Sequence, residues 1–418
     1  MTGDSVEIKE VVLRDIEPLI RQKLGDHVIV ENFKAQSLLP PGENFGSTIL
    51  KVDVELRDEH AEKTEELHLI GKMLPLTEFQ RLVFDSSRTF FKETFMYQTI
   101  IPAYNKVELE SGVNIHETFD IVPKFYGWRS SIQPDVELDD DAVFLMENLK
   151  VKGYYNGDRT VGYDLEHSII AVKALAKFHA LGMAIKQKKP GLFEVFKMHA
   201  KLSPMVGDDT LVLEAMLQTI KSDPELSVYY SRCEKVLKEM RISVIWSDVP
   251  REPWMTIIHS DFWVNNILFH RNDEGKVDDV KFVDFQLYVY SSAIRDLLFY
   301  LFSSIHSDIT EEQLEGLMDV YYNTLIEKLN QLGCDTKCFN KEAFREKMAE
   351  DAPREFVHLC FMLKVLTLDV KQTNFDYVRI QKFMEQYEGN QLLSKLLRKV
   401  VMYFCKHNWL PELNETPE

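Results

Sequence analysis

The fold is decided by residues 255–288, which read MTIIHSDFWVNNILFHRNDEGKVDDVKFVDFQLY. The apolar run at 255–258 predicts a strand that leads Asp261 into a loop, and Asn266 follows five residues later. A strand, a turn and a second strand come next, and the second strand ends on Asp284. One hairpin is therefore expected to bring a carboxylate, an amide and a second carboxylate close together.

The hairpin is predicted from its own local signals. Residues 267–269 are apolar and predict a short buried strand. Residues 272–275 form a turn signal in which Gly275 can take a positive φ angle. Residues 280–283 then predict the returning strand.

This set of side chains suits phosphoryl transfer. The reaction needs a base that orients an attacking hydroxyl, and oxygen ligands that hold Mg²⁺ against the nucleotide phosphates. We expect Asp261 to take the proton of the hydroxyl, and we count His259 with it as a candidate catalytic residue. We expect Asn266 and Asp284 to hold the metal. The alternative is a capped loop before a hairpin, with carboxylates that are only solvated.

Composition limits the class of protein. The chain has 418 residues, which favours two domains or lobes over one core. Its 49 Lys and Arg against 67 Asp and Glu give a formal net charge of -18. Nucleic acids and anionic membranes attract basic surfaces, so neither is expected as a partner.

The cysteines and the apolar segments indicate in which compartment of the cell the protein is expected. Five scattered cysteines argue against a disulfide framework and favour a reducing compartment, so we expect a cytoplasmic protein. The first residues lack the basic and apolar runs of a signal peptide. A run of about eighteen apolar residues would be needed to cross a membrane, and we find none in the sequence. No obligate protein partner is evident from the sequence.

Residues 1–148 are expected to form the smaller of two lobes. A long, largely helical stretch is predicted at 79–104, and strands are predicted at 28–33, 48–56, 65–74, 121–128 and 142–146. Nearly everything in 149–418 predicts helices instead. The predicted fold class is therefore α+β, with a small antiparallel-sheet lobe and a larger, mainly helical lobe.

Four residues of the first lobe are candidates for contacting nucleotide phosphates. Gly42 and Asn44 lie between two predicted strands, in a loop whose tip could cover phosphates or could be only a turn. Lys72 lies near the end of an apolar strand, where a lysine must reach water or find a partner. Glu93, on the helical stretch that follows, could be that partner, or both side chains could face water.

Strand character stops at residues 144–149, FLMENL. In a two-lobed kinase this segment would be the hinge. The backbone groups of Glu147 and Leu149 would then bond the edge of the adenine.

Two polar residues in apolar surroundings are expected to be structural. His179 lies on an apolar face of the helix predicted at 165–186. It is interpreted as a core histidine whose ring nitrogens have hydrogen-bond partners inside the protein. Asp296 begins a buried helix and therefore needs hydrogen-bond donors. The backbone of the loop around Asp261 is the expected source of these donors.

With these residues identified, the chain resembles the ecdysteroid kinase-like family over essentially its full length. That family is related to choline kinases and aminoglycoside phosphotransferases. The order His-x-Asp, Asn, hairpin, Asp-Phe also resembles the catalytic and metal loops of the protein kinase-like superfamily. The resemblance rests on Gly42-Glu43-Asn44, Lys72, Phe91-x-Glu93 with Tyr97 and Pro102, residues 144–149, residues 175–180, His259-x-Asp261-x-Trp263-x-x-Asn266 and Asp284-Phe285-Gln286.

The resemblance implies that ATP phosphorylates an alcohol group of a small molecule, ecdysteroid hormones being the best-known acceptors of the family. Carried over residue by residue, it implies the following roles: Asp261 as the base, Asn266 and Asp284 as Mg²⁺ ligands, Lys72 with Glu93 at the phosphates, and Glu147 to Leu149 as the adenine hinge.

Two positions depart from the pattern of related kinases. Ser260 stands where related phosphotransferases commonly have Gly, which argues against a strained turn there because serine favours ordinary backbone angles. Gln286 stands where protein kinases have Gly, so no flip of that loop is expected. Residues 281–310 also lack an Ala-Pro-Glu anchor and an activation loop, which argues against a protein substrate.

Several functions stay open at this point. The first is a kinase for an apolar alcohol such as a steroid or a xenobiotic. The second is a choline- or ethanolamine-type kinase, which would want an aromatic and acidic cage. Candidate aromatic residues for such a cage are Trp246, Trp254, Tyr229 and Tyr230. The others are a catalytically silent kinase fold that only binds, and a metal-dependent hydrolase that uses the same carboxylates.

Overall fold

The computed structural model describes residues 12–38, 46–61, 63–202, 210–240, 245, 251–367 and 390–412. Their contacts divide the chain into two compact units. The first contains the described residues up to Gln98 together with Pro123–Gly153. The second contains Thr99–Val122 and the described residues from Tyr154 onwards. The fold class is α+β, as predicted.

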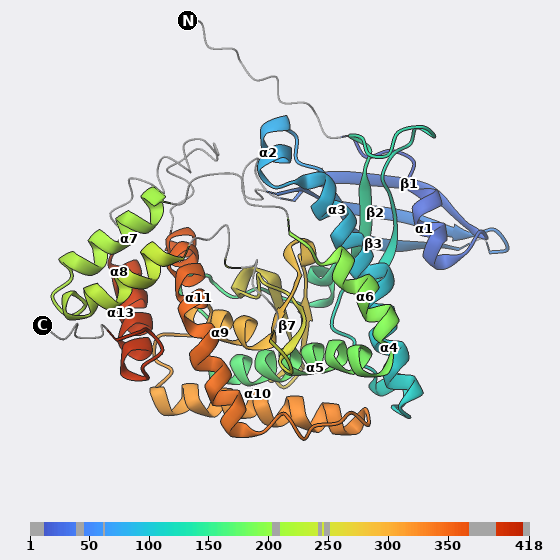
Figure 1. Cartoon of the computed structure of the whole chain (residues 1–418). Coiled ribbons are helices and arrows are strands. Elements are labelled where there is room, and N and C mark those ends of the chain that lie inside the picture. Colours follow the sequence, from blue (N-terminus) through green and yellow to red (C-terminus); the bar gives the residue numbers. More distant parts are fainter. Residues whose placement is uncertain are drawn as a thin grey trace, which may run out of the picture. The chain divides into compact units, whose positions relative to one another are not determined.

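The first unit is built on an antiparallel sheet of five strands in the order β1-β2-β3-β5-β4 (Figure 1). The strands are β1 (Val28–Ser37), β2 (Thr48–Asp58), β3 (Thr64–Met73), β4 (Phe125–Arg129) and β5 (Val143–Glu147). The helices are α1 (Glu17–Leu24), α2 (Glu78–Val83) and α3 (Ser86–Phe95), with a short turn η3 (Leu149–Lys152) after β5.

The core of this sheet comes from the two-residue period of its strands. Leu50, Val52 and Val54 alternate along β2 and are buried on one face. Leu19 and Ile20 of α1 belong to the same apolar cluster. Removing these side chains from water is the main driving force for the unit, at about 25 cal/mol per Å² of apolar surface.

The chain after α3 continues through a π-helical turn, η1 (Met96–Ile100), into α4 (Ile101–Glu110). The helical stretch predicted at 79–104 therefore consists of several shorter helices. Thr99–Val122, which the sequence placed in the first lobe, groups by its contacts with the second unit.

The second unit is mainly helical, as predicted for the larger lobe. Its helices are α4, α5 (Leu165–Lys188), α6 (Pro190–His199), α7 (Thr210–Ser222), α8 (Tyr230–Glu239), α9 (Ala293–Ser303), α10 (Glu311–Gln331), α11 (Lys341–Thr367) and α13 (Gln391–Lys406). Short turns are η2 (Ile115–Glu117), η4 (Ser227–Tyr229), η5 (Val264–Asn266) and η6 (Phe285–Leu287). Two strand pairs are β6 (Met255–Ile258) with β9 (Val289–Ser292), and β7 (Ile267–Arg271) with β8 (Val277–Phe282).

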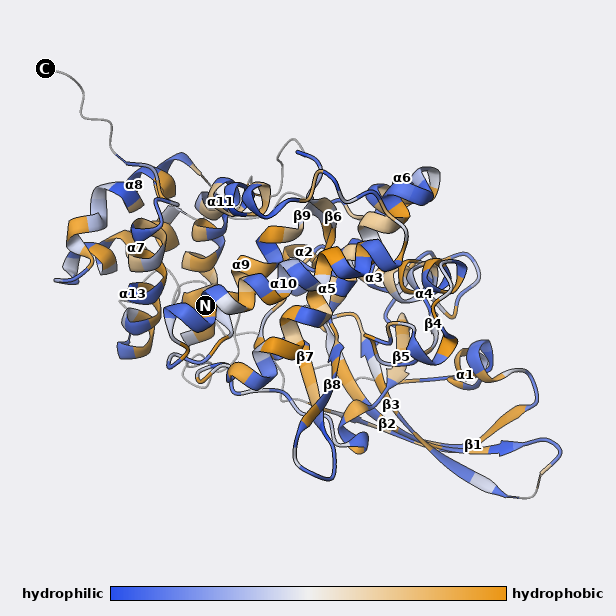
Figure 2. Ribbon diagram, turned by 90° about the horizontal axis from the view of Figure 1, so that it is seen from below, coloured by the Kyte–Doolittle hydropathy of each residue, from blue (hydrophilic) through white to orange (hydrophobic). Residues whose placement is uncertain are grey.

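Helix α5 is the central helix of this unit. Asp164 caps it, because its side chain accepts the N–H of His167 at 3.0 Å. By length and composition alone α5 could cross a bilayer, but 78% of its most apolar window is buried inside the structure. Figure 2 shows its mainly apolar residues among the other elements of the unit, where it packs against α10, α4, α6 and β6.

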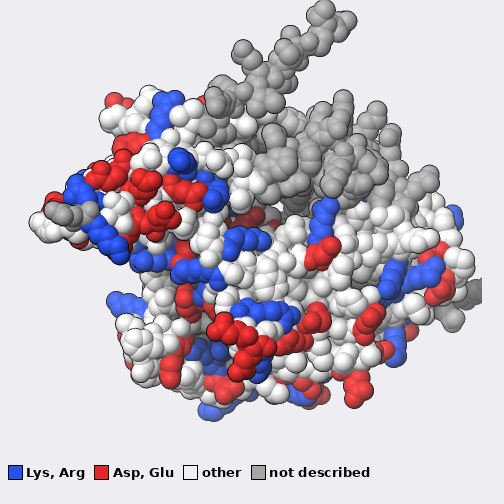
Figure 3. Space-filling model, turned by 180° about the vertical axis from the view of Figure 1, so that it is seen from behind, with Lys and Arg blue, Asp and Glu red and all other residues white. Residues whose placement is uncertain are grey.

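The charged side chains on one face of the molecule are mixed. On the face drawn in Figure 3, acidic and basic residues are interspersed. The acidic excess of the sequence is therefore accompanied by basic side chains on this face.

Candidate active site

The predicted hairpin forms and positions the candidate site. Strand β7 pairs with β8 in antiparallel register. In the turn between them Gly275 has φ +77°, and its N–H bonds the carbonyl of Asn272 at 2.8 Å. Strand β6 leads into the loop that carries Asp261, and Asp284 follows Val283 just beyond the end of β8. The order of elements predicted from the sequence is confirmed.

Asp261 and Asn266 are in direct contact. The Asn266 Nδ2 donates to Asp261 Oδ2 at 2.8 Å and to the Asp261 carbonyl at 2.9 Å. Both bonds use the amide nitrogen, which leaves the amide oxygen as the group that could serve a metal. The N–H of Val283 bonds the carbonyl of Asn266 at 3.0 Å and so links this loop to the residue before Asp284.

Asp284 lies near enough to Asp261 to alter its ionisation. Burial raises the pKa of Asp261 to about 7, and the negative charge of Asp284 adds to the increase. Asp261 keeps part of its surface exposed, but its carboxyl group is surrounded by protein. The repulsion between these two carboxylates is the kind that a divalent cation relieves.

The donor set fits Mg²⁺, which prefers carboxylate, amide and phosphate oxygens and keeps several waters. Among the residues that the structure describes, no group of three or more His, Cys, Asp and Glu side chains could enclose a metal by itself. A magnesium ion here would therefore depend on Asn266, Asp284 and oxygens from outside the protein, as is usual when Mg²⁺ is bound together with a nucleotide.

Ser260 corrects one expectation. Its φ angle is +63°, so the turn adopts the left-handed conformation that the serine seemed to argue against. Two hydrogen bonds stabilise this left-handed backbone conformation. Ser260 Oγ donates to the carbonyl of Leu287 at 2.6 Å, and the N–H of Ser260 donates to Asp296 Oδ1 at 2.8 Å. The surrounding contacts thus fix a conformation that local preference disfavours.

Asp296 accepts hydrogen bonds from the backbone of the loop that carries Asp261, as predicted. Its Oδ2 accepts the N–H of His259 at 2.7 Å, and its Oδ1 accepts that of Ser260. His179 Nε2 lies 3.1 Å from Asp296 Oδ2, and His179 Nδ1 lies 2.7 Å from the hydroxyl of Tyr321. His179 is therefore a buried histidine with a partner at each ring nitrogen, as the sequence predicted. Its contacts join α5, α9 and α10 next to the loop that carries Asp261.

His259 lies inside the protein and contacts backbone groups. Its Nε2 lies 3.0 Å from the carbonyl of Val283, so we assign the proton to Nε2 because a carbonyl can only accept. Its Nδ1 then accepts the N–H of Asp261 at 3.3 Å. Burial lowers the pKa of His259. The ring joins the loop of Asp261 to the segment that carries Asp284.

In the first unit, Lys72 and Glu93 form the predicted pair. Lys72 Nζ donates to Glu93 Oε2 at 2.6 Å, and both side chains are buried. Lys72 lies opposite Phe144 in the register of β3 and β5. The alternative in which both side chains face water is wrong.

The remaining candidates lie at the end of β5 and in the loop after β1. Strand β5 ends at Glu147, whose N–H bonds the carbonyl of Lys124 at 2.8 Å, and Leu149 begins the short turn η3. The predicted hinge therefore stands where strand pairing stops, and its adenine contacts stay a prediction. Gly42 and Asn44 lie outside the described residues.

Two side chains near Asp261 had no role in the sequence analysis. Trp263 is nine-tenths buried, and its side chain lowers the pKa of Asp261 together with that of Asn266. His358 of α11 also lowers that pKa. Trp263 could have been found from its place in the loop motif. His358 has no such signal, since only the packing of a distant helix brings it near.

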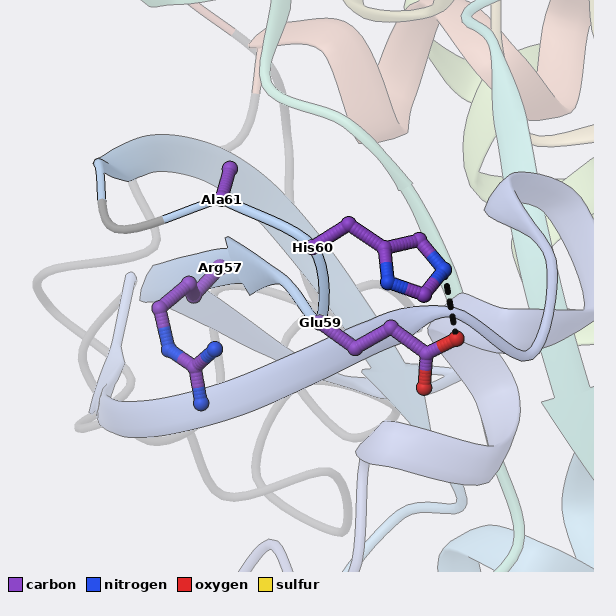
Figure 4. Close-up of a pocket in the computed structure, with 4 residues that line it drawn as sticks. All are labelled: Arg57, Glu59, His60 and Ala61. Atoms are coloured by element: carbon purple, nitrogen blue, oxygen red, sulfur yellow. Dashed lines mark ion pairs between the residues drawn. The ribbon is translucent and has the colours of Figure 1, made fainter.

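A surface depression lies elsewhere, at the turn after β2 (Figure 4). It is lined by Arg57, Glu59, His60 and Ala61, and His60 pairs with Glu59 at 3.1 Å. The predicted site residues do not line it, so it has no part in the site described here.

The ecdysteroid kinase-like family model matches residues 41–334, which is more than half of the chain. No curated protein matches it. Similar solved structures include an ethanolamine kinase of Plasmodium vivax, with 12% identity, 87% of this chain and 85% of that chain covered, and a TM-score of 0.35.

Two further solved structures are similar at the same level. Amicoumacin kinase in complex with AMP-PNP, Ca²⁺ and Ami has 15% identity, coverage of 85% of this chain and 90% of that chain, and a TM-score of 0.42. A choline/ethanolamine kinase family protein of Mesorhizobium loti has 11% identity, coverage of 88% and 92%, and a TM-score of 0.31. At these low scores, the family match is the finding that classifies the chain.

Proposed function

Because this chain belongs to the ecdysteroid kinase-like family, we propose that it is an ATP-dependent kinase of small molecules. It transfers the γ-phosphoryl group to a hydroxyl of an apolar alcohol, such as an ecdysteroid, another steroid or a xenobiotic. The observation that carries this proposal is the contact of Asp261 with Asn266, next to the carboxylate of Asp284. These three residues combine a base with two oxygen ligands.

The cofactors of this reaction are ATP and Mg²⁺. Asn266 and Asp284 are the residues that hold the metal, which neutralises charge on the phosphates when it is bound. In the first unit, Lys72 contacts phosphate oxygens and Glu93 keeps its ammonium group in place. The backbone of Glu147 and Leu149 bonds the adenine, and Gly42 and Asn44 complete the nucleotide contacts.

Asp261 acts as the general base. As the acceptor oxygen forms its bond to the γ-phosphorus and ADP leaves, the proton of the hydroxyl passes to the Asp261 carboxylate. A pKa of about 7 suits this role, because a base is most effective near the working pH. The Asn266 amide holds the carboxylate in one orientation.

His259 is a positioning residue in this mechanism. Both of its ring nitrogens contact backbone groups, which favours support of the loop over contact with the acceptor. Asp296 has the same kind of role, since it accepts hydrogen bonds from two successive N–H groups of the loop.

The apolar acceptor is preferred to choline for one structural reason. Trp254, a candidate for an aromatic cage, is buried and packs against Phe339 and Phe344 at ring distances of 5.0 and 5.6 Å. It therefore belongs to the core. Trp246, another candidate, lies outside the described residues. On the basis of charge and cysteine content, we also propose a cytoplasmic location without nucleic-acid, membrane or obligate protein partners.

The proposal is tested with Mg²⁺ and γ-labelled ATP against ecdysteroids, other steroids, plant glycosides, choline and ethanolamine. We expect label on an apolar alcohol. Asp261→Ala should lower turnover by about 10²- to 10⁴-fold while ATP still binds, which is the usual scale for losing a general base.

The matched control is Asp278→Ala, which removes an exposed carboxylate of the same hairpin. It should keep wild-type turnover. Turnover that Asp261→Ala leaves intact would show that another group is the base. Label on choline alone would favour the choline-type alternative, and bound ATP without transfer to any acceptor would favour the silent fold.

A further inference from the structure

Residues 154–163 precede α5 and are fixed to two other elements of the second unit. The N–H of Tyr155 bonds the carbonyl of Phe269 in β7 at 2.9 Å, and the N–H of Phe269 bonds the carbonyl of Tyr155 at 2.9 Å. The N–H of Tyr163 bonds the carbonyl of Ser304, just after α9, at 2.8 Å. This segment has no role in the proposed reaction so far, yet it lies against the loop that leads into β7.

The hydroxyl of Tyr163 lies among the backbone groups of that loop. It is 2.9 Å from the carbonyl of Ile267 and 3.2 Å from that of Val264, which lie on either side of Asn266 in the chain. It also accepts the N–H of Gly157 at 2.8 Å. A tyrosine hydroxyl has one proton, which the two carbonyls therefore share. The side chain of Tyr163, which is buried, thus links both sides of Asn266 to the segment.

Two neighbouring residues complete this contact. Asn156 Nδ2 donates to the carbonyl of Asn265 at 2.9 Å and to that of Ile267 at 3.3 Å. Gly157 lets the ring of Tyr163 approach, because a Cβ at this position would lie 2.6 Å from the ring. The carbonyls immediately before and after the proposed metal ligand therefore both accept hydrogen bonds from this segment.

The side chain of Asn266 makes its orientation depend on this backbone. Its Nδ2 already donates to Asp261, so the amide oxygen is the group left for a metal. The place of that oxygen follows from where the backbone puts the Cα of Asn266. Buried carbonyls need donors in any case, but here the donors of Tyr163 and Asn156 converge on the residues that flank a single side chain.

We propose that Tyr163, together with Asn156, is a positioning residue for the metal ligand Asn266. The two side chains hold the backbone on both sides of Asn266 and so keep its amide oxygen in the orientation that metal binding requires. The inference rests on the proposed function, which gives Asn266 its metal. Loss of either side chain acts on the nucleotide only through Mg²⁺ in this role.

The test measures the affinity for a fluorescent ATP analogue over a range of Mg²⁺ concentrations and again in EDTA. Tyr163→Phe removes the hydroxyl and keeps the ring, which packs against His167 and Phe269. Asn156→Ala removes the other donor at a half-buried position, and it decides the test if Tyr163→Phe does not fold. Melting temperatures show which variants are folded.

The matched control is Tyr322→Phe. The hydroxyl of Tyr322 also donates to a backbone carbonyl, that of Phe339 at 2.8 Å, in the segment between α10 and α11. The variant therefore removes the same kind of hydrogen bond where the proposed site has no residue.

We expect Tyr163→Phe to raise the Mg²⁺ concentration at half-saturation of analogue binding about tenfold, the scale on which lost supporting contacts weaken metal sites. Asn156→Ala should raise it by a smaller factor, because Tyr163 still bonds the carbonyl of Ile267. Both variants should keep the wild-type affinity for the analogue in EDTA. Tyr322→Phe should change neither quantity.

The inference is overturned if folded Tyr163→Phe, or Asn156→Ala where Tyr163→Phe does not fold, keeps the wild-type half-saturation by Mg²⁺. It is also overturned if the affinity in EDTA falls by the same factor, as in a general structural defect, or if Tyr322→Phe has the same effect. Wild-type protein that binds the analogue equally in Mg²⁺ and in EDTA would instead overturn the metal role of Asn266 and Asp284 in the proposed function, and this inference with it.

Discussion

Asp261 shows the conflict between function and stability in a single residue. Burial raises the pKa of its carboxyl group from 3.8 to about 7, so the folded protein binds the proton more tightly than the unfolded chain does. At pH 8 the group is ionised in both states, and the buried charge destabilises the folded one. This destabilisation of the folded state decreases as the pH falls below 7. It is absent below about 4, where the carboxyl group is protonated in both states.

Replacing this charge should therefore stabilise the protein in the absence of metal and nucleotide. We expect Asp261→Asn to raise the melting temperature in EDTA by about 5 °C at pH 8, and by less than half of that at pH 5. Scanning calorimetry at the two pH values measures the difference. Asp308→Asn, at an exposed carboxylate, should change neither value. An equal gain at both pH values would contradict the raised pKa.

Ser260 shows how contacts override local preference. A non-glycine residue in the left-handed region costs about 1 kcal/mol or more, yet Ser260 also gains the hydrogen bond from its hydroxyl to Leu287. Glycine would remove the backbone cost and the bond, whereas alanine would remove the bond alone.

The comparison of Ser260→Gly with Ser260→Ala isolates the backbone term. We expect the glycine variant to be the more stable of the two by about 1 kcal/mol, because both lack the hydroxyl and only alanine keeps the steric conflict. Urea unfolding of the two variants side by side measures this difference. An alanine variant that equals or exceeds the glycine variant would mean that residue 260 does not adopt a left-handed conformation in solution.

At the scale of residues, the partners that buried polar groups need could be predicted from the sequence, whereas contacts between residues far apart in the sequence could not. A lysine in an apolar strand needs a partner, so the pairing of Lys72 with Glu93 could be predicted. The donors for Asp296 could be predicted for the same reason. The φ angle of Ser260 and the approach of His358 to Asp261 could not, because both depend on residues far away in the sequence.

At the scale of elements, local signals predicted the centres of the strands better than their ends. Strand β1 was predicted at 28–33 but continues to Ser37, since its pairing with β2 carries it through polar residues. Strand β8 begins at Val277, earlier than the predicted 280, for the same reason. Pairing with a neighbouring strand is a tertiary contact, and the pattern of apolar residues does not report it.

The Lys72–Glu93 pair joins two elements, β3 and α3. Both side chains are buried, so the ions depend on each other far more than a surface pair does. In the proposed function this pair keeps the lysine directed at the phosphates.

Glu93→Gln should therefore weaken both the fold and the nucleotide site. We expect a loss of about 3 kcal/mol in stability, because the charge of Lys72 stays buried while its acidic partner becomes neutral. Affinity for a fluorescent ATP analogue should fall about tenfold, the result of a lysine that is no longer held in place. Glu311→Gln, in the exposed pair with Lys406, should change both values little. Unchanged analogue affinity in Glu93→Gln would remove the pair from the nucleotide site.

At the scale of the whole molecule, the assignment of Thr99–Val122 to the second unit was not predictable. Glu108 of α4 is buried and pairs with Lys328 of α10. Its other carboxylate oxygen accepts the N–H of Phe119 at 2.8 Å. Lys281 of β8 contacts Asp120 at 2.9 Å. The bonds to Lys328 and Lys281 join parts of the chain that are far apart in sequence, whereas the predicted boundary was marked only by a change in composition.

Binding of Mg-ATP should be visible in the stability of the whole protein. A ligand that binds only the folded state stabilises it by about 2.7 kcal/mol at a hundred times its dissociation constant. We therefore expect saturating Mg-ATP to raise the first melting transition of the wild-type protein by several degrees. ATP with EDTA should give a smaller shift, since Asn266 and Asp284 act on the nucleotide through the metal in the proposed mechanism.

Variants then separate the contributions to this shift. Asp284→Ala should lose the part that depends on Mg²⁺ and keep the part that ATP gives in EDTA. Lys72→Ala should reduce both parts, because the ammonium group contacts the phosphates directly in this mechanism. Asp261→Ala should keep the full shift, since the base acts on the acceptor. A rise in melting temperature that is equal with and without Mg²⁺ would contradict a metal bound with the nucleotide at this site. A Mg²⁺-dependent rise that Asp284→Ala leaves intact would place the metal elsewhere. Either result would mean that Asp261 and Asp284 serve different functions.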